Sequence, residues 1–166
     1  MDTEPLSGSL STSLSAIQQR IVAREFDGAL ADLAELRESH PNSEDALYMS
    51  ALCNRYTRHF QESLTLLSRL VDLAPDSGRA WQETGHTHRD LGQLQEALHA
   101  YTRACQLNAA LEGSWTSMQK IATQLGRTQQ AVYAQSNIER IKKTPQPLVV
   151  AADMIAEGKL LRAEDI

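Results

Sequence analysis

The sequence predicts an all-α fold built from repeated helix pairs, and two observations carry this prediction. The first is composition. Alanine, leucine, glutamine, glutamate and arginine are abundant and aromatic residues make up only 5%, which favours helices over strands by intrinsic propensity. The second is an internal period of about 34 residues, which is typical of chains made of stacked supersecondary units. Such units share a continuous core with their neighbours.

The period is visible in three segments that begin at equal intervals along the chain and align without gaps. They are REFDGALADL from Arg24, RHFQESLTLL from Arg58 and GQLQEALHAY from Gly92. The same shift also brings a tryptophan pair and a glycine pair into register. The columns are Phe26/Phe60/Leu94, Ala29/Ser63/Ala97, Leu33/Leu67/Tyr101, Trp81/Trp115 and Gly92/Gly126.

Residue types within a unit have definite structural roles. Small residues such as Gly85 and Ala97 allow the two helices of a pair to approach closely. Large residues such as Trp81 and Tyr101 fill the space between successive units. Gly92 ends the first helix of its pair, because glycine tolerates the left-handed conformation found there.

This periodicity places four helix pairs within residues 10–143. Pro41 and Pro75 stop the second helices of two pairs, because proline lacks an amide hydrogen and its ring clashes with the preceding turn. Residues 1–9 contain little that is apolar and are expected to form a disordered tail. Residues 144–166 are expected to form an incomplete fifth unit that begins with a helix through LVVAADMIAEG. The predicted pairs are 10–24 with 27–39, 44–57 with 60–73, 78–91 with 94–107, and 112–125 with 128–142.

The pattern resembles the tetratricopeptide repeat, a helix-turn-helix of about 34 residues with the motif W-x2-L-G-x2-Y, then A-x3-F, then P. The unit from Gly78 to Leu111 fits best. It departs from the motif at Thr84, His88 and Ala109, where the family has Leu, Tyr and Pro. The resemblance implies a right-handed α-solenoid whose first helices line a concave face, on which partner proteins or peptides usually lie. The matching residues are Trp81, Gly85, Ala97, Tyr101 and Ala104.

The resemblance also implies which side chains face a partner. Tyrosine and arginine are enriched at binding hot spots, so Tyr48, Tyr56, Arg55 and Arg89 are the preferred contacts. The alternative is that this face is solvated and its aromatic residues are incidental. The full predicted set is Tyr48, Met49, Leu52, Arg55, Tyr56, Gln82, Glu83, His86, Arg89 and Lys120.

Some members of the family hold a partner's C-terminal carboxylate with a clamp of Lys and Asn on successive first helices. Gln18, Tyr48 and Leu52 lie near such places in this sequence, so the clamp is absent and binding of chaperone tails is disfavoured.

No catalytic residue, metal site or cofactor is predicted, and this chain is not expected to be an enzyme. It contains no G-x-G-x-x-G, G-x-x-x-x-G-K-[ST], G-x-S-x-G or H-E-x-x-H. His86 and His88 lie two residues apart on a helix and point about 200° from each other, so they do not share a metal ion easily. Cys53 and Cys105 are expected to be buried free thiols.

The net charge and the lack of long apolar stretches leave proteins as the expected class of partner. The net charge of −5 offers no attraction to phosphate backbones, so nucleic acid is not an expected partner. The N-terminal MDTEPLSGSLSTSLS has no basic start, and no apolar stretch reaches membrane-spanning length. We therefore expect a cytoplasmic protein that does not contact membranes.

Two functions remain open at this stage. One is an adaptor that binds a peptide in the concave groove. The other is the N-terminal module of a larger bacterial enzyme, because PLVVAADMIAEGKLLRAEDI is similar to a segment of bacterial tetratricopeptide proteins that end in a sulfotransferase domain. The apolar residues Leu148, Val149, Val150, Met154 and Ile155 in this segment also predict a homodimer formed through the C-terminal helix.

Overall fold

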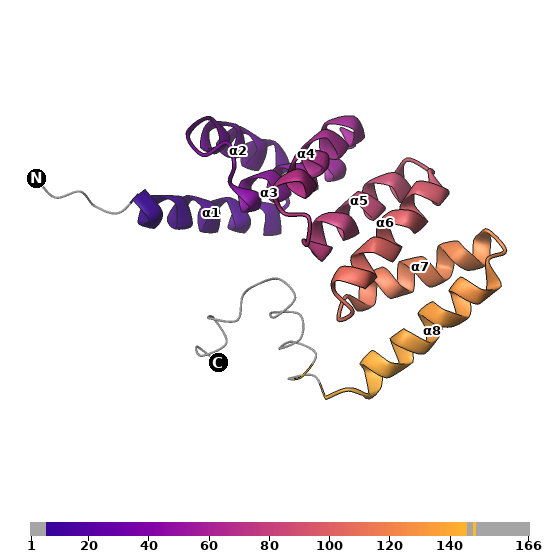
Figure 1. The fold of residues 1–166 in the computed structure, drawn as a ribbon. Coiled ribbons are helices and arrows are strands. Elements are labelled where there is room, and N and C mark those ends of the chain that lie inside the picture. The colour runs from indigo at the N-terminus through magenta and orange to yellow at the C-terminus, as the bar shows by residue number, and fades with distance from the viewer. Residues whose placement is uncertain (1–5, 146–147, 149–166) are drawn as a thin grey trace, which may run out of the picture. The chain divides into compact units, whose positions relative to one another are not determined.

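The computed structural model describes residues 6–145 and Leu148. In this part of the chain it contains eight α-helices and no strand (Figure 1). The predicted all-α fold is therefore confirmed, and from the second helix onward every predicted boundary agrees with the structure to within one residue. The helices are α1 Leu6–Val22, α2 Phe26–Ser39, α3 Glu44–Tyr56, α4 Phe60–Leu73, α5 Gly78–Asp90, α6 Leu94–Leu107, α7 Glu112–Gln124 and α8 Thr128–Lys143.

The N-terminal helix differs most from the prediction. It begins at Leu6, inside the segment 1–9 that was expected to be a tail. The reason is the spacing of Leu6, Leu10 and Leu14, which recur every four residues and so share one helix face. Leu10 and Leu14 pack against the neighbouring core. The predicted fifth unit lies outside the described residues, apart from its first residues up to Pro145 and the exposed Leu148.

The chain divides into two compact units, the first ending at Ala74 and the second beginning at Pro75. In the first unit α1 packs on α2 and α3, α2 packs on α3, and α3 packs on α4. In the second unit α5 packs on α6, α6 on α7, and α7 on α8. Each unit therefore contains two helix pairs.

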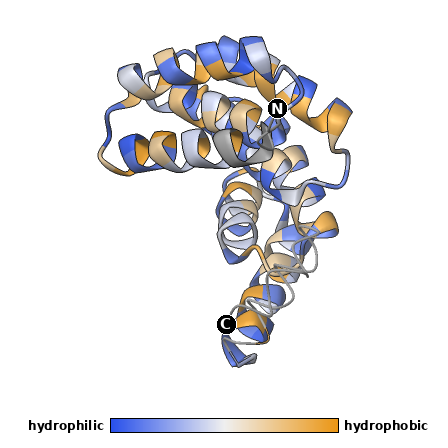
Figure 2. Ribbon diagram, turned by 90° about the vertical axis from the view of Figure 1, so that its left-hand side faces the viewer, coloured by the Kyte–Doolittle hydropathy of each residue, from blue (hydrophilic) through white to orange (hydrophobic). Residues whose placement is uncertain are grey.

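Each unit has its own apolar core. Figure 2 shows hydrophobic and hydrophilic stretches alternating along the helices, as expected when one face of each helix is buried. In the first unit the core lies between α1, α2 and α3, and in the second it extends from α6 to α8. The first core contains Ile17, Ala29, Leu33, Leu36, Ala46 and Cys53, and the second includes Leu98, Tyr101, Trp115, Met118, Ile121 and Ile138.

The turns inside the four helix pairs repeat one backbone conformation. The second residue after each first helix has a positive φ, of 62° at Arg24, 67° at Arg58, 76° at Gly92 and 69° at Gly126. These four positions are successive members of one column of the repeat. The left-handed conformation predicted for Gly92 is confirmed, and arginine adopts it in the first unit at a steric cost that glycine avoids.

The two tryptophans of the repeat pack alike, as predicted from their common column. Trp81 meets His99 edge to face, with ring centroids 6.1 Å apart and an interplanar angle of 76°. Trp115 meets Tyr133 in the same way, at 5.5 Å and 76°. They differ at the indole nitrogen. Trp115 Nε1 donates to the Ala109 carbonyl at 3.0 Å, whereas the buried Nε1 of Trp81 has no hydrogen-bond partner among the described residues.

Candidate protein-interaction surfaces

The first unit presents an aromatic and cationic stack at the C-terminal end of α3. The Tyr56 ring lies parallel to the Phe26 ring of α2, with centroids 4.9 Å apart and an interplanar angle of 6°. The Arg55 guanidinium carbon lies 4.4 Å from the centroid of the Tyr56 ring. Tyr56 nevertheless remains 53% exposed. This stack pre-orders a large amphipathic side chain at the surface, which lowers the entropic cost of contacting a partner.

The other residues of α3 that were predicted to contact a partner are less exposed than Tyr56. Tyr48 and Leu52 are half-buried. Met49 is also half-buried and packs against the core of the first unit, because its flexible side chain reaches the cluster formed by α1 and α2. Met49 therefore contributes to packing, and its contact with a partner stays a prediction. Phe26 was not predicted as a site residue, because only the fold brings α2 beside Tyr56.

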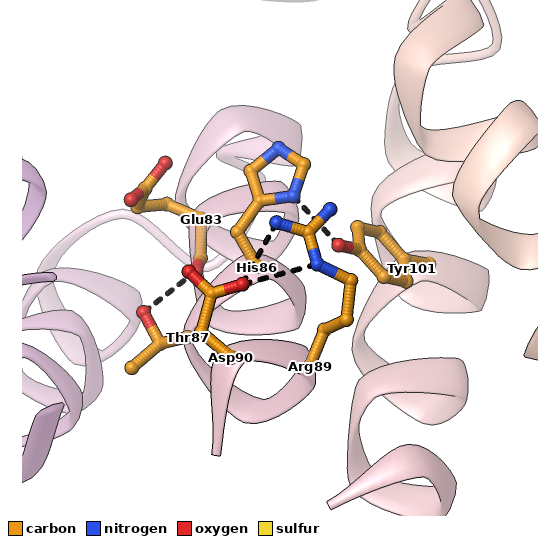
Figure 3. A network of polar contacts seen from close by, with 6 residues as sticks. All are labelled: Glu83, His86, Thr87, Arg89, Asp90 and Tyr101. Atoms are coloured by element: carbon orange, nitrogen blue, oxygen red, sulfur yellow. Dashed lines mark hydrogen bonds and ion pairs between the residues drawn. The ribbon is translucent and has the colours of Figure 1, made fainter. Parts of the chain in front are cut away.

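The second unit contains a polar network centred on Tyr101 of α6. Its hydroxyl lies 2.6 Å from Nδ1 of His86 on α5 and also hydrogen-bonds to Ser117 of α7. Figure 3 shows His86 and Arg89 reaching toward Tyr101 from α5. Burial raises the pKa of Tyr101 to about 12, and this effect exceeds the lowering by Arg89 and by the Ser117 hydrogen bond. The phenol is therefore protonated at neutral pH and joins three helices.

Gly85 explains why Tyr101 fits here. A Cβ atom at Gly85 would lie 2.8 Å from both Cδ1 and Cε1 of the Tyr101 ring. The absence of a side chain therefore lets the ring lie against the α5 backbone while its hydroxyl reaches His86. Gly85 was predicted to let the backbones of the two helices approach, but the structure corrects this: the nearest neighbour is the aromatic ring of Tyr101 and not the backbone of α6.

The remaining predicted contacts of the second unit divide into accessible and inaccessible residues. Arg89 and Lys120 are exposed, and Arg89 forms an ion pair with Asp90 at 2.9 Å. Gln82 is half-buried, with its amide nitrogen 3.4 Å from the place of a Cβ at Gly113. Glu83 is only 3% exposed. It was predicted as a groove contact from its helical position, but its burial removes the carboxylate from a partner's reach.

The described residues give no indication of metal or redox chemistry. No group of three or more His, Cys, Asp or Glu side chains in them is placed to hold a metal ion. Cys53 and Cys105 are buried free thiols, as predicted, and burial raises the pKa of Cys53 to about 11 and that of Cys105 to about 12. Both are thus neutral thiols at physiological pH. Among the helices of the described part, none has the length and apolarity needed to cross a membrane.

Consecutive helix pairs that recur with one fixed period define a helical-repeat protein. Comparison with protein families identifies the repeat, because residues 45–77 and residues 78–110 each match a tetratricopeptide repeat model. These two segments, each one helix pair of the chain, therefore match the tetratricopeptide repeat. Among curated proteins, no sequence matches the chain significantly.

Solved structures of tetratricopeptide proteins share the fold. The crystal structure of MamA is 21% identical, with 89% of this chain and 86% of that chain covered and a TM-score of 0.68. MamA 41-end from Desulfovibrio magneticus RS-1 is 14% identical over 82% and 77%, with a TM-score of 0.72. The first TPR of Spaghetti (RPAP3), bound to the HSP90 peptide SRMEEVD, is 16% identical over 75% and 99%, with a TM-score of 0.68. At these identities the likeness concerns the fold alone.

The family matches end at residue 110, so they do not reach the C-terminal segment that resembles sulfotransferase-associated proteins. That resemblance stays a prediction, as does the assignment to a bacterial cytoplasmic protein.

Proposed function

We propose that this chain is a non-enzymatic interaction scaffold that binds an extended peptide of a partner protein along the first helices of its repeats. The observation that carries the proposal is that each unit exposes side chains on its first helices, α3 in the first unit and α5 and α7 in the second. Tyr56, Arg89 and Lys120 are exposed there and are not needed to close either core. Tetratricopeptide repeats and a peptide-bound structural neighbour support the same function.

The two units offer different chemistry to such a peptide. On the first unit, the stacked Tyr56 and Arg55 suit an apolar or aromatic residue that can lie on a ring. On the second unit, the half-buried His86 of α5 and the exposed Lys120 of α7 suit a polar or acidic residue. The scaffold would therefore select a segment with mixed apolar and polar character.

The peptide is not expected to be a chaperone tail held by its C-terminal carboxylate. The structural neighbour RPAP3 is bound to an HSP90 peptide. In this chain Gln18, Tyr48 and Leu52 lie near the places where the family's Lys and Asn clamp is found. Selectivity is therefore expected to come from the Tyr56 stack and the cations rather than from a carboxylate clamp.

Affinity capture with the full chain, followed by titration of the captured partner, tests this proposal. The double variant Tyr56→Ala, Arg89→Ala changes one exposed contact in each unit and should weaken binding by about tenfold or more. The matched control is Tyr133→Ala, Arg103→Ala, which removes an exposed tyrosine and an exposed arginine from the second helices α8 and α6.

The control should bind like the parent chain, and both variants should keep the helical circular dichroism spectrum. Equal affinity of the parent and the Tyr56, Arg89 variant would overturn the proposal. A loss confined to the control variant would place the binding surface on the second helices instead.

A further inference from the structure

A cavity between α1 and α2 in the first unit is separate from the surface proposed above. Its volume is about 460 Å³. Ile17 and Leu36, both buried, lie beside it, and Ser13 and Ala16 line it from α1. Two acidic residues, Asp32 and Glu35, line it from α2. The cavity is therefore apolar on one side and acidic on another.

The repeat explains why this space is open. Ser13 occupies the column that holds Trp115 three periods later. In the last pair Trp115 is only 4% exposed and packs with Ala134 in the core of the second unit. Asp32 stands in the column of Ala134. The first pair has thus replaced an indole by a hydroxyl and an alanine by a carboxylate, which leaves room for a side chain from elsewhere.

The two carboxylates differ in their availability. Asp32 Oδ2 lies 3.2 Å from Nε of Arg20 and forms a partly exposed ion pair with it. Glu35 is exposed and forms no ion pair with any residue in the described part of the chain. A cation entering the cavity therefore finds one carboxylate that has no ion-pair partner among the described residues.

We propose that this cavity receives an arginine side chain from a basic segment of a partner protein. The aliphatic stem would cover Ile17 and Leu36, and the guanidinium would pair with Glu35 through its planar donors. Arginine is favoured over lysine because its flat head suits both the space left by the missing indole and a carboxylate. The net charge of −5 favours the approach of a basic partner. This site does not depend on peptide binding by α3, α5 and α7.

The test is a titration of the isotope-labelled full chain, followed by nuclear magnetic resonance, with the peptide acetyl-Gly-Arg-Gly-amide. Amide shifts should change in α1 and α2 around Ile17 and Leu36, and the peptide with Lys should bind more weakly. Glu35→Gln should weaken binding about three- to tenfold. Glu38→Gln is the matched control, because it removes the same charge from the same helix outside the cavity and should leave the affinity unchanged.

Ser13→Trp fills the cavity as Trp115 fills its own column, and should abolish the shifts. If this variant folds poorly, the comparison of Glu35→Gln with Glu38→Gln still tests the proposal. The proposal is overturned if no shifts appear in α1 and α2, if Glu35→Gln and Glu38→Gln behave alike, or if acetyl-Gly-Trp-Gly-amide binds more tightly than the arginine peptide. The double variant Tyr56→Ala, Arg89→Ala should bind the arginine peptide normally, which separates this site from the first-helix surface.

Discussion

Gly85 shows how one missing side chain can organise a polar network. The Tyr101 ring occupies the space beside it, and Tyr101 in turn positions its hydroxyl between His86 and Ser117. The fully buried ring cannot swing away without breaking these hydrogen bonds. The small residue is thus required by an aromatic neighbour and not by helix formation, since glycine lowers helix propensity.

We predict that Gly85→Ala destabilises the fold by about 1–3 kcal/mol through overpacking against Tyr101, despite the higher helix propensity of alanine. Gly113→Ala is the control, because its Cβ would meet only the flexible end of Gln82, at 3.4 Å. Denaturation in urea measures both changes. Equal stabilities of the two variants would show that the Tyr101 ring adapts to a methyl group without cost.

The turn inside each helix pair is the clearest feature at the level of elements. Gly92 and Gly126 have nothing within 4 Å of the place where a Cβ would stand. Any cost of a side chain there is therefore a cost of the left-handed backbone alone. Arg24 and Arg58 already carry that cost in the first unit, at φ values of 62° and 67°.

We expect Gly92→Ala and Gly126→Ala each to cost about 1 kcal/mol, because a Cβ disfavours positive φ. Arg58→Ala is the comparison, since that position already holds a non-glycine residue, and should change stability by less than about 0.5 kcal/mol. Thermal unfolding of the three variants measures these differences. A similar loss of stability in all three variants would mean that the side chain, and not the backbone conformation, determines stability at this column of the repeat.

At the scale of the whole molecule, α6 and α8 carry different residues on equivalent faces. The face compared is the one by which α6 packs on α7. Tyr101 and Cys105 of α6 are buried in the core shared with α7. Their counterparts on α8 are Gln135 and Glu139, which are exposed and joined by a hydrogen bond of 3.0 Å. At these two positions α8 is therefore polar, whereas Val132 on the same helix face is 61% exposed.

Leu148, an apolar residue that follows α8 in the sequence, is 61% exposed. We therefore predict self-association of two chains through the predicted helix 148–157. Light scattering coupled to size exclusion should give a mass near twice that of a single chain at high micromolar concentration. Truncation after Lys143 should restore the monomer. A monomeric full chain, or a dimer that survives truncation, would contradict the prediction.

Much of the fold follows from the sequence because the repeat is a local signal. Helix bounds and the left-handed turn at Gly92 both depend on residue types at set spacings within a single repeat unit. The start of α1 was placed too late because its serine-rich first turns have weak helix propensity. The helix is stabilised instead by leucine side chains that pack on other helices.

The exposure of the candidate site residues depends more on tertiary structure than the helix bounds do. Helical spacing placed Met49 and Glu83 on the partner-facing side, but side chains from other parts of the fold bury one partly and the other almost completely. The stacking of Tyr56 on Phe26 brings together residues from two helices that no spacing rule connects. The sequence alone determined the period, the resemblance to tetratricopeptide repeats and the helix pairs. Only the packed structure decided which side chains reach solvent, because burial depends on neighbours that are distant along the chain.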